Sequence, residues 1–487
     1  MEKVPAGWQL ELLGNLVMKM SNGANVKQHD ESVGYPISRI ETIWNGNIDS
    51  QRVKYIKEND SDFVNKYKLK EGDILFSHIN SDSHIGKTAI YRGQPEVLIH
   101  GINLLLIRFS DEYCQDFFNY QFKYLKENGA FSAVAQRAVN QSSINQHKLK
   151  SFPFIYPNLE EQKRIVVKIE ELFSELDSGI ASLKTAQEQL KIYRQALLKH
   201  AFEGKLTEHW RKDNADKLET PEQLLARIQT ERETRYQQQL EEWKQAVKDW
   251  EAKGKEGKKP TKPNKIIKAE KLSESDLANV PSLPASWFWL KVGMLCDVVR
   301  GGSPRPAGDS RFYDGEIPFL KVADLTRVTG LYVNSAAYTI KPAGLQKTRA
   351  VSPNTLLISN SGATLGVPKI CTIYATFNDG VAAFLRLGEE ELKYHYYFWE
   401  SKTAELRAIN QGAAQPNLNT DLIKDTLFPS CSLAEQQEIV NQLEEKLSII
   451  EQNEKEIESA LAKAELLRQS ILKKAFSGRL IYKESNS

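Results

Sequence analysis

The chain has 487 residues, of which 41% are hydrophobic and 26% are charged, and its formal net charge is +2. This composition is typical of a folded, soluble protein and excludes a disordered or membrane-embedded chain. No apolar run approaches the ~20 residues of a membrane span, and the sequence does not begin with a basic region followed by an apolar core. We therefore expect a cytoplasmic protein, and its length predicts several domains.

The four cysteines do not form a pattern that binds metal or pairs as disulfides. They stand at Cys114, Cys296, Cys371 and Cys431, with no C-x-x-C pair and no histidine at ligand spacing. We expect isolated buried thiols and no metal site.

The first globule is expected over residues 1–157, with a mixed α/β (α+β) fold. Apolar runs at 73–76 and 102–107 are bounded by Gly, Asn and Asp, a pattern that favours strands of a twisted sheet. A short helix is expected at about residues 112–128.

A long helix is expected over residues 158–206. Its apolar residues recur mostly in steps of three and four, which predicts lengthwise packing on another helix. A helix of this kind, about 40 residues long, rises roughly 60 Å. The apolar positions are Ile165, Ile169, Leu172, Leu176, Ile180, Leu183, Leu190, Tyr193 and Leu197.

Residues 207–282 are expected to form a helical insertion followed by a Lys-rich linker. Thr220-Pro221 predicts the start of a helix, and its apolar stripe suits docking either on the first long helix or on a partner protein. The stripe consists of Leu225, Ile228, Tyr236, Leu240, Trp243, Val247 and Trp250. The run from Lys253 to Lys271 suits a flexible solvated linker or a nonspecific phosphate contact.

A second globule is expected over residues 283–431, and a second long helix with a tail over residues 432–487. Apolar runs at 356–358 and 382–385 predict strands, and a short helix is expected at about residues 389–408. The apolar positions of the second long helix are Ile439, Leu443, Leu447, Ile450, Ile457, Leu461, Ala464, Leu467 and Ile471.

The two halves of the chain are copies of one pattern. Residues 159–206 align without a gap on residues 433–480, an offset of 433 − 159 = 274. Upstream, Pro5-Ala6-Gly7-Trp8 recurs as Pro284-Ala285-Ser286-Trp287, residues 34–40 match 315–321, and residues 69–77 match 351–359. Since two copies are too few for a solenoid, we expect a pseudo-twofold internal repeat in which the long helices pair as an antiparallel coiled coil.

The sequence shows no catalytic motif. Gly86-Lys87-Thr88 imitates the end of a P-loop, but Ser81 stands where that motif requires glycine. His147 and His200 lie near the long helix without a nucleophile and carboxylate around them, so we interpret them as surface histidines. The chain is therefore expected to bind a ligand rather than to catalyse a reaction.

Polar and basic residues gather in matching loops of both globules. Arg and Lys donate to guanine, and Asn and Gln pair with adenine, so such loops suit DNA readout, although each residue could instead form a turn or a solvated surface. Asn145 and Asn419 could also cap the stretch that follows them. The candidates are Lys27, Arg39, Ser77, His78, Asn80, Ser81, Lys87, Gln141 and Asn145 in the first globule, and Ser303, Arg305, Arg311, Lys321, Asn360, Ser361, Thr364, Gln415 and Asn417 in the second.

With these motifs in place, the chain resembles the specificity (S) subunits of type I restriction-modification enzymes over nearly its whole length. The resemblance rests on the order of elements, on Gly302-Ser303-Pro304 leading to residues 315–320, and on Leu-x-Glu-Gln at 159–162 and 433–436. The Ala-Phe-x-Gly sequences that end both long helices complete it. One departure is Ser21-Asn22-Gly23-Ala24, where the second globule has a Gly-x-x-Pro sequence.

The resemblance implies a noncatalytic subunit with two target recognition domains, each reading half of a bipartite site in double-stranded DNA. It implies two methyltransferase (modification) subunits bound through the helical region, with restriction/motor subunits joining that complex. S-adenosylmethionine, ATP and Mg would then belong to those partners. The partner-facing positions that it implies are Gln162, Arg194, Gln195, Phe202, Gly204, Gln436, Arg468, Gln469, Phe476 and Gly478. The alternative is a two-headed coiled-coil scaffold without DNA specificity.

Overall fold

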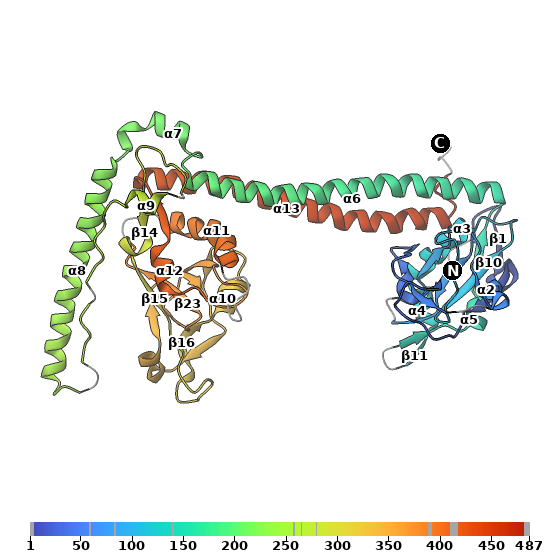
Figure 1. The fold of residues 1–487 in the computed structure, drawn as a ribbon, viewed down its shortest axis with the longest axis horizontal. Coiled ribbons are helices and arrows are strands. Elements are labelled where there is room, and N and C mark those ends of the chain that lie inside the picture. Colours follow the sequence, from blue (N-terminus) through green and yellow to red (C-terminus); the bar gives the residue numbers. More distant parts are fainter. Residues whose placement is uncertain are drawn as a thin grey trace. The chain divides into compact units, whose positions relative to one another are not determined.

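The computed structural model describes residues 4–57, 60–81, 84–138, 141–256, 259–263, 265–278, 280–387, 392–409 and 417–481. These fall into two compact units (Figure 1). Unit 1 comprises Met1–Ala186 and Lys455–Ser487, and unit 2 comprises Gln187–Glu454. Each unit therefore holds one globule and a part of each long helix.

The core of unit 1 is an antiparallel sheet in the strand order β2-β10-β7-β9. Its strands are β2 (Val17–Asn22), β10 (Leu104–Phe109), β7 (Ile74–Ser77) and β9 (Thr88–Ile90). A second pair joins β1 (Gln9–Leu12) to β13 (Pro153–Tyr156), and a third sheet has the order β11-β12-β8. The predicted strands at 73–76 and 102–107 are confirmed with small shifts of their ends.

The remaining elements of unit 1 are short apart from one helix. The predicted helix at 112–128 is confirmed as α3 (Gln115–Glu127), which packs on the sheet through Phe117, Phe118 and Phe122. The other elements are α1 (Leu13–Leu16), β3 (Tyr35–Ile37), η1 (Ile40–Thr42), β4 (Ile43–Trp44), β5 (Asn47–Ile48), β6 (Lys54–Ile56), α2 (Ser61–Tyr67), β8 (Ile79–Asn80), α4 (Ala130–Val134), β11 (Gln136–Ala138), β12 (Gln141–Ser143) and α5 (Gln146–Lys150).

Unit 2 repeats this core and adds to it. Its main sheet has the order β15-β23-β20-β21-β17, so the first four strands correspond to those of unit 1. The strands are β15 (Asp297–Arg300), β23 (Val381–Leu385), β20 (Thr355–Ser359), β21 (Pro368–Cys371) and β17 (Tyr332–Val333). The pair β14 (Phe288–Lys291) and β24 (Leu427–Ser430) matches β1 and β13, as the repeated Pro-Ala-x-Trp sequence predicts.

A further four-stranded sheet, in the order β18-β16-β22-β19, distinguishes unit 2, and its strand β16 is labelled in Figure 1. The helix expected at about 389–408 is α11 (Leu392–Ile409). The other elements of the globule are η3 (Val292–Met294), β16 (Tyr313–Leu320), α10 (Val322–Arg327), β18 (Tyr338–Ile340), η4 (Pro342–Lys347), β19 (Arg349–Val351), β22 (Ala375–Phe377) and α12 (Thr420–Asp425).

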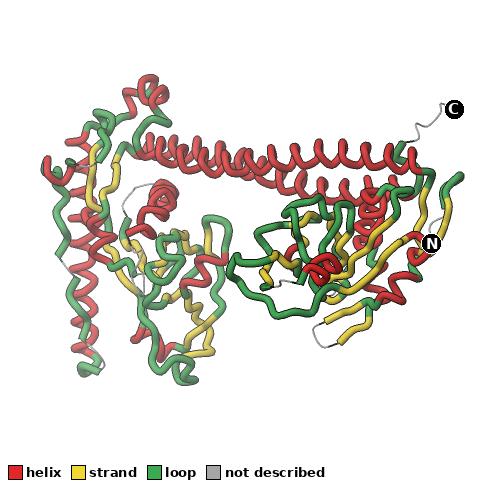
Figure 2. The backbone as a smooth tube through the Cα atoms, turned by 45° about the vertical axis from the view of Figure 1, so that its right-hand side comes forward, coloured by secondary structure: helices red, strands yellow, loops and turns green. Residues whose placement is uncertain are grey.

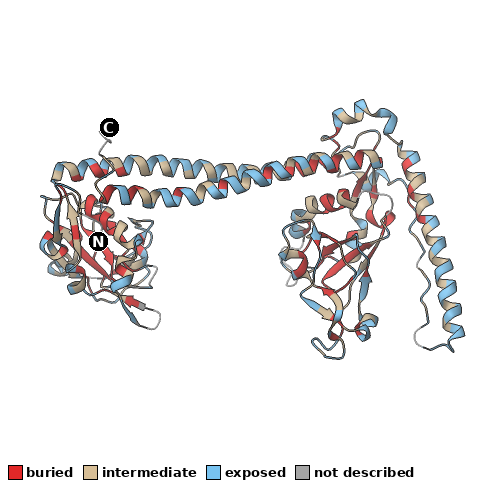
Figure 3. Cartoon of the chain, turned by 180° about the vertical axis from the view of Figure 1, so that it is seen from behind, coloured by how far each residue is buried: buried red, intermediate tan, exposed pale blue. Residues whose placement is uncertain are grey.

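Both long helices are confirmed, as α6 (Leu159–Phe202) and α13 (Leu433–Phe476). They run antiparallel, since the beginning of α6 and the end of α13 belong to unit 1, whereas the end of α6 and the beginning of α13 belong to unit 2. Buried residues mark the packed side of each helix (Figure 3). The predicted apolar seam was wrong at Tyr193 and Leu467, because both side chains are 51% exposed.

The Glu-Gln pair at the start of each long helix fastens that helix to its globule. In unit 1, Trp8 Nε1 donates to Glu161 Oε1 (3.2 Å), and Gln162 Nε2 donates to the Pro157 carbonyl (2.9 Å). In unit 2, Trp287 Nε1 donates to Glu435 Oε2 (2.8 Å), and Gln436 Nε2 donates to the Cys431 carbonyl (3.0 Å). The repeated Pro-Ala-x-Trp and Glu-Gln motifs therefore have one shared structural role.

The Ala-Phe-x-Gly sequence closes the other end of each helix against a globule. Phe202 packs on Tyr394 and Phe398 in unit 2, and Phe476 packs on Phe117 and Tyr124 in unit 1.

The following glycine ends each helix in the left-handed region that favours glycine, with φ of +72° at Gly204 and +71° at Gly478. Any Cβ would lie 2.4 Å from Pro284 in the first case and 2.8 Å from Pro5 in the second. The glycines thus permit a close approach of the repeated Pro-Ala-x-Trp sequence.

These contacts correct part of the partner-facing set. Gln162, Gln436, Phe202 and Phe476 are buried inside their own units, and a buried side chain has almost no surface left for a partner. The two glycines meet prolines of the same unit.

Two arginines of that set join the long helices to each other. Arg194 lies 3.8 Å from Glu451 and 3.7 Å from Glu454, and Arg468 forms an ion pair with Asp177. Of the ten positions, Gln195 and Gln469 are exposed and remain predicted partner contacts.

The insertion lies entirely in unit 2. It comprises α7 (Glu208–Asp213), η2 (Ala215–Lys217), α8 (Pro221–Ala252) and α9 (Glu274–Leu277). Thr220 caps α8 as expected, accepting from Gln223 N at 3.3 Å. Among the described residues, every helix is too short or too polar to cross a membrane.

Candidate nucleic-acid interface

In unit 2, several loops meet at one edge of the main sheet. β15 ends at Arg300, β20 ends at Ser359 and β23 begins at Val381, and these strands are paired so that Arg300 faces Ala382 and Ser359 faces Val381. We call this place the loop edge of unit 2. The loops that follow Arg300 and Ser359, and the turn before Val381, carry most of the predicted site residues of this unit.

Asp379 organises the first of these loops. Ser303 Oγ donates to Asp379 Oδ1 at 2.6 Å, and Arg305 Nη2 lies 3.9 Å from Asp379 Oδ2. The Arg305 side chain is 72% exposed, so it is available for a ligand. Farther along the loop, Arg311 is equally exposed and is held by Asp309 at 2.7 Å, which lowers the pKa of that carboxyl to about 2.

Four more predicted residues lie around the same edge. Lys321 precedes α10, and its Nζ lies 3.2 Å from the centroid of the Tyr338 ring. Ser361 forms a β-bridge with exposed Asn417. Exposed Thr364 belongs to the turn after Asn360, and its carbonyl accepts from Ser359 Oγ at 2.7 Å.

Unit 1 has a corresponding loop edge, where β2 ends at Asn22, β7 ends at Ser77 and β10 begins at Leu104. The Ala24 N–H donates to the His100 carbonyl (2.7 Å), just as the Gly302 N–H donates to the Phe377 carbonyl (3.1 Å). Gly23 and Ala24 therefore occupy the places of Gly301 and Gly302, so the unit 1 counterpart of the Gly-x-x-Pro sequence is Gly23-Ala24-Asn25-Val26 rather than the predicted Ser21-Asn22-Gly23-Ala24.

Gly23 shares the steric requirement of Gly301. A Cβ on Gly23 would lie 2.3 Å from the His100 carbonyl oxygen, and one on Gly301 would lie 2.3 Å from the carbonyl oxygens of Asn378 and Phe377. The close backbone approach explains why both sequences keep a glycine here although their other residues differ.

His78 and Asn360 hold equivalent positions at the two loop edges. The Ile144 N–H donates to the His78 carbonyl (2.9 Å), and the Leu418 N–H donates to the Asn360 carbonyl (2.7 Å). Both side chains are buried, as is that of Ser77, and burial lowers the pKa of His78 to about 4. This corrects the prediction that these three residues contact DNA, because their side chains lie inside the protein.

The other predicted residues of unit 1 have varied surroundings. Lys27 and Ser81 are exposed, and Arg39 lies 3.1 Å from Glu41 at the start of η1. Asn145 caps α5 by accepting from Lys148 N at 2.8 Å, and Asn419 caps α12 in the same way, so the capping alternative is confirmed for both. Gln415 and the side chains of Asn80 and Gln141 lie outside the described residues.

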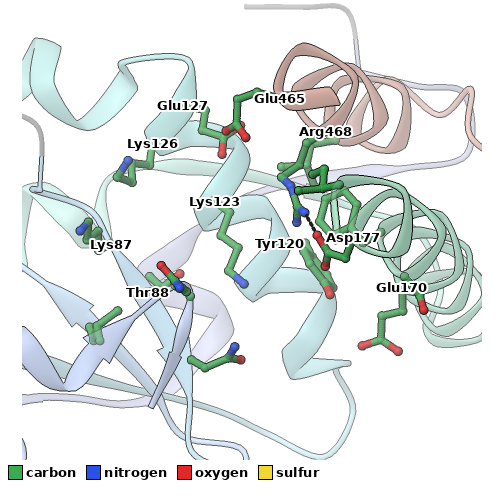
Figure 4. A pocket seen from close by; sticks show the side chains of 18 of the residues that line it. Lys87, Thr88, Tyr120, Lys123, Lys126, Glu127, Glu170, Asp177, Glu465 and Arg468 are labelled. Atoms are coloured by element: carbon green, nitrogen blue, oxygen red, sulfur yellow. Dashed lines mark hydrogen bonds and ion pairs between the residues drawn. The ribbon is translucent and has the colours of Figure 1, made fainter. Parts of the chain in front are cut away.

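Lys87 lies in a groove of unit 1 with a volume of about 1070 Å³. The groove is lined by β9, α3 and the long helices, and Figure 4 shows Lys87, Lys123 and Lys126 on one side and the Arg468–Asp177 ion pair on the other. Burial is the main reason why the pKa values of Lys87 and Lys123 are lowered. Four acidic residues share the lining, so the groove is mixed in charge: Glu127, Glu170, Asp177 and Glu465.

Sequence reasoning missed three residues near the loop edges. Arg300 ends β15, and its Nε donates to the Asp379 carbonyl, while Asp379 itself orders the loop of Ser303. Arg137 is exposed on β11, which joins the loop edge of unit 1 through β12 and β8. The position of Arg300 directly before the Gly-Gly sequence was a usable signal, whereas Asp379 carried none.

The comparisons with known proteins agree with this doubled architecture. Residues 5–191 and 284–460 both match the family described as type I restriction modification DNA specificity domain. The putative type I restriction enzyme MjaX specificity subunit of Methanocaldococcus jannaschii is 39% identical over 208 residues, covering 42% of this chain and 48% of the relative. The chain thus matches about half the length of this relative and of two others.

A longer match and a solved structure extend the similarity. The EcoBI specificity subunit of Escherichia coli is 24% identical over 477 residues, covering 95% of this chain and 84% of the relative. A chain solved in work on complex assembly and conformational transition of the type I restriction-modification system has a TM-score of 0.66 at 18% identity, covering 98% of this chain and all of that one, and supports the fold alone. With two matched regions that together span most of its length, the chain belongs to the type I restriction modification DNA specificity domain family.

Proposed function

We propose that the chain is the noncatalytic DNA specificity subunit of a type I restriction-modification complex and reads a bipartite site in double-stranded DNA, one half at each loop edge. One observation carries this proposal: the two loop edges share the same backbone hydrogen bonds but present different exposed side chains. The hydrogen bonds of Ala24 and Gly302 repeat, whereas the neighbouring loops present different polar groups. A fold that keeps its framework and varies its loops suits the reading of two unrelated half-sites.

The exposed residues at each edge are the proposed DNA contacts. In unit 2, Arg305 and Arg311 suit guanine O6 and N7, and Asn417 suits adenine. In unit 1, exposed Lys27 and half-buried Arg39 supply the positive charge, and exposed Ser81 supplies a hydroxyl. Phosphate contacts would position the duplex, and base contacts would provide the specificity.

The long helices are the proposed attachment sites for two methyltransferase subunits. Ile192 and Tyr193 on α6 are 68% and 51% exposed, and Leu466 and Leu467 on α13 are 65% and 51% exposed. These two apolar pairs are related by the repeat offset, since 192 + 274 = 466. Exposed apolar patches commonly mark protein interfaces, and two equivalent patches suit two copies of one partner.

In this proposal, the catalytic work belongs to the partners. The methyltransferase subunits bind S-adenosylmethionine, and the restriction/motor subunits, which join through them, use ATP and Mg. The complex acts in the cytoplasm, where it meets DNA.

Methylation sequencing tests the proposal directly. DNA would be sequenced from cells that express the chain with its methyltransferase subunit, and from cells that express that subunit alone. We expect a split motif with a fixed gap that is methylated only when the chain is present. Equal methylation in both samples would reject the role in specificity and favour a protein scaffold.

A further inference from the structure

The insertion of unit 2 is one continuous arm rather than a helix followed by a loose linker. Residues 259–263 and 265–271 return along α8: Trp243 Nε1 donates to the Pro260 carbonyl (3.1 Å), and the Ala269 N–H donates to Gln229 Oε1 (2.9 Å). Lys271 closes the arm at its base with an ion pair to Glu222 (2.6 Å). The returning segment therefore lies against the outer part of the stripe, at Trp243 and Trp250, and we call α8 together with this segment the basic arm.

The base of the basic arm is fixed to the second globule. Leu224, Ile228 and Ala269 belong to the same buried cluster as residues of the main sheet and the end of α6. Farther along α8 toward its C-terminal end, Arg235 Nη1 donates to the Arg386 carbonyl at 2.6 Å. These contacts hold the direction of the arm relative to the main sheet of unit 2.

The tip of the arm reaches the level of the loop edge. Arg386 directly follows the end of β23, whereas Val381 begins that strand at the loop edge, about 17 Å away. From Arg235 to the end of α8 at Ala252 there are 252 − 235 = 17 residues, a rise of about 26 Å. Figure 1, Figure 2 and Figure 3 agree that α8 runs beside the globule in the direction of the loops, so the tip extends past the loop edge.

The tip and the returning segment are strongly basic. Residues 253–271 contain eight lysines and two glutamates. Lys253, Lys255, Lys259 and Lys262 are exposed, and none of them forms an ion pair with another described residue. Lys259 Nζ lies 6.0 Å from the centroid of the Trp250 ring, and Lys262 Nζ lies 5.8 Å from that of Trp243. These cation–π contacts hold the ammonium groups and leave their positive charge in place.

We propose that the basic arm binds the phosphate backbone of the DNA that flanks the half-site read by unit 2. This inference rests on the proposed function. The arm holds lysines without ion pairs at the level of the recognition loops. These lysines suit a polyanion that lies across the loops, and in the proposed function that polyanion is a DNA duplex. The contact carries no sequence information, since phosphates are the same at every base pair. It lengthens the footprint on one side of the site and adds to the salt dependence of binding.

The test compares the full chain, assembled with its methyltransferase subunits, with the variant Lys253→Gln/Lys255→Gln/Lys259→Gln/Lys262→Gln. A control variant removes equal charge at the other end of unit 2: Lys199→Gln/Lys205→Gln/Lys212→Gln/Lys217→Gln. Duplexes carry the methylated split motif with a minimal flank, or with a flank extended by one helical turn, roughly 10 base pairs, beside either half-site. Dissociation constants are measured over a series of salt concentrations.

We expect the wild-type complex to bind more tightly when the flank beside the unit 2 half-site is extended, and the arm variant to lose that gain. The slope of log affinity against log salt should fall by about 0.9 for each phosphate contact removed, and the control should match the wild type. An arm variant with an unchanged slope and an unchanged gain would overturn the inference. So would an arm variant that loses its methyltransferase subunits at an unchanged slope, since the arm would then serve a protein contact.

The failure of the proposed function would look different. In that case the wild-type complex would not prefer the split motif over random duplex, whatever the flank. Retained binding of the minimal duplex by the arm variant shows that the variant is folded.

Discussion

Units 1 and 2 begin their long helices with the same motif, but its energetic surroundings differ. Glu161 of unit 1 is partly exposed and accepts one hydrogen bond, from Trp8. Glu435 of unit 2 is fully buried and accepts from Trp287, from Thr207 Oγ1 (2.8 Å) and from Arg211. The insertion supplies Arg211, and this turns a surface contact into a buried charge network.

The difference shows that the repeated motif specifies which residues join the long helix to the globule, but not how much that contact stabilises the fold. Trp8 and Trp287 occupy matching places, and each indole donates to the glutamate of its Glu-Gln pair. What surrounds that hydrogen bond depends on segments outside the repeat. Substitutions at paired positions should therefore have unequal effects.

Glu435→Gln should produce the largest effect on stability. It leaves Arg211, whose side chain is only 14% exposed, without a carboxylate, and the loss of one partner from a buried pair typically costs about 3–5 kcal/mol. Glu161→Gln keeps an acceptor for Trp8 in a partly exposed place, so we expect a loss under about 1 kcal/mol. Denaturant unfolding of both variants checks this. Equal losses would show that the Arg211 network adds nothing.

Arg305→Ala should reduce discrimination in one half of the DNA site by roughly 1–3 kcal/mol, the range for a good base contact. Lys27→Ala is the matched change at the loop edge of unit 1 and should alter only the other half. Methylation sequencing of cells that carry each variant reads both halves at once. A single substitution that relaxes both half-sites would contradict separate reading by the two units.

At one place in the repeat, unit 2 has a buried histidine where unit 1 has a phenylalanine, and this histidine should add to the pH dependence of stability. His395 stacks on Phe428 with a centroid distance of 4.3 Å, where unit 1 has Phe118 near Phe154. Burial lowers the pKa of His395 to about 3, below the ordinary value of 6.5. Because the unfolded chain binds the proton more readily, the stabilising contribution is complete above pH 6.5 and is lost as the pH falls toward 3.

His395→Phe should remove this dependence. Relative to the wild type, we expect a gain of roughly 2 kcal/mol at pH 5, at about 1.4 kcal/mol per pH unit below the ordinary pKa. Unfolding by denaturant at neutral and acidic pH measures it. His100 in unit 1, whose pKa burial lowers to about 4, remains in both proteins and sets a common background slope. An equal acid sensitivity of variant and wild type would contradict the prediction.

Each apolar pair on the long helices should affect one methyltransferase subunit. Ile192→Ser/Tyr193→Ser should weaken one of two bound copies by about tenfold, or about 1.4 kcal/mol, and Leu466→Ser/Leu467→Ser should weaken the other. The combined variant should lose both. Native mass spectrometry over a range of subunit concentrations counts the copies. A pair variant that still binds both copies at wild-type affinity would place the docking sites elsewhere.

The arginines between the long helices should give the smallest effect. Arg194→Met and Arg468→Met remove partly exposed ion pairs, and ion pairs at the surface typically contribute about 0–1 kcal/mol. The second loss should be the larger, because the Arg468 guanidinium also lies 4.6 Å from the centroid of the Phe173 ring. Thermal unfolding at low and high salt compares them. A larger loss for Arg194→Met would contradict this ranking.

Much of the fold could be read from local patterns. The steps of three and four predicted both long helices, and short apolar runs bounded by turn-forming residues predicted β7, β10, β20 and β23, because both signals lie within short stretches of the sequence. The caps of Asn145 and Asn419 were also available as an alternative, since a side chain that bonds a nearby N–H needs only local geometry. The 274-residue offset related the two halves before any contact was known.

The residues of the candidate site were harder to predict from the sequence. Arg305 and Asn360 look alike as loop residues, yet one is 72% exposed and the other is fully buried. Which of them can meet DNA depends on strand pairing between distant segments. Similarly, Gln162 and Gln436 were predicted to face a partner. Each side chain instead donates a hydrogen bond to the carbonyl five residues earlier, just after a strand, and is buried there.

Sequence periodicity, helix caps and the repeat established the long helices, the sheet cores and the doubled plan, because all of these follow from residues close together or from direct repetition. Contacts between distant segments decided which polar residues are buried and what Glu435 binds. They also decided that the Lys-rich segment returns along α8. These outcomes depend on which surfaces exclude water from one another, and that competition is settled only when the whole chain has packed.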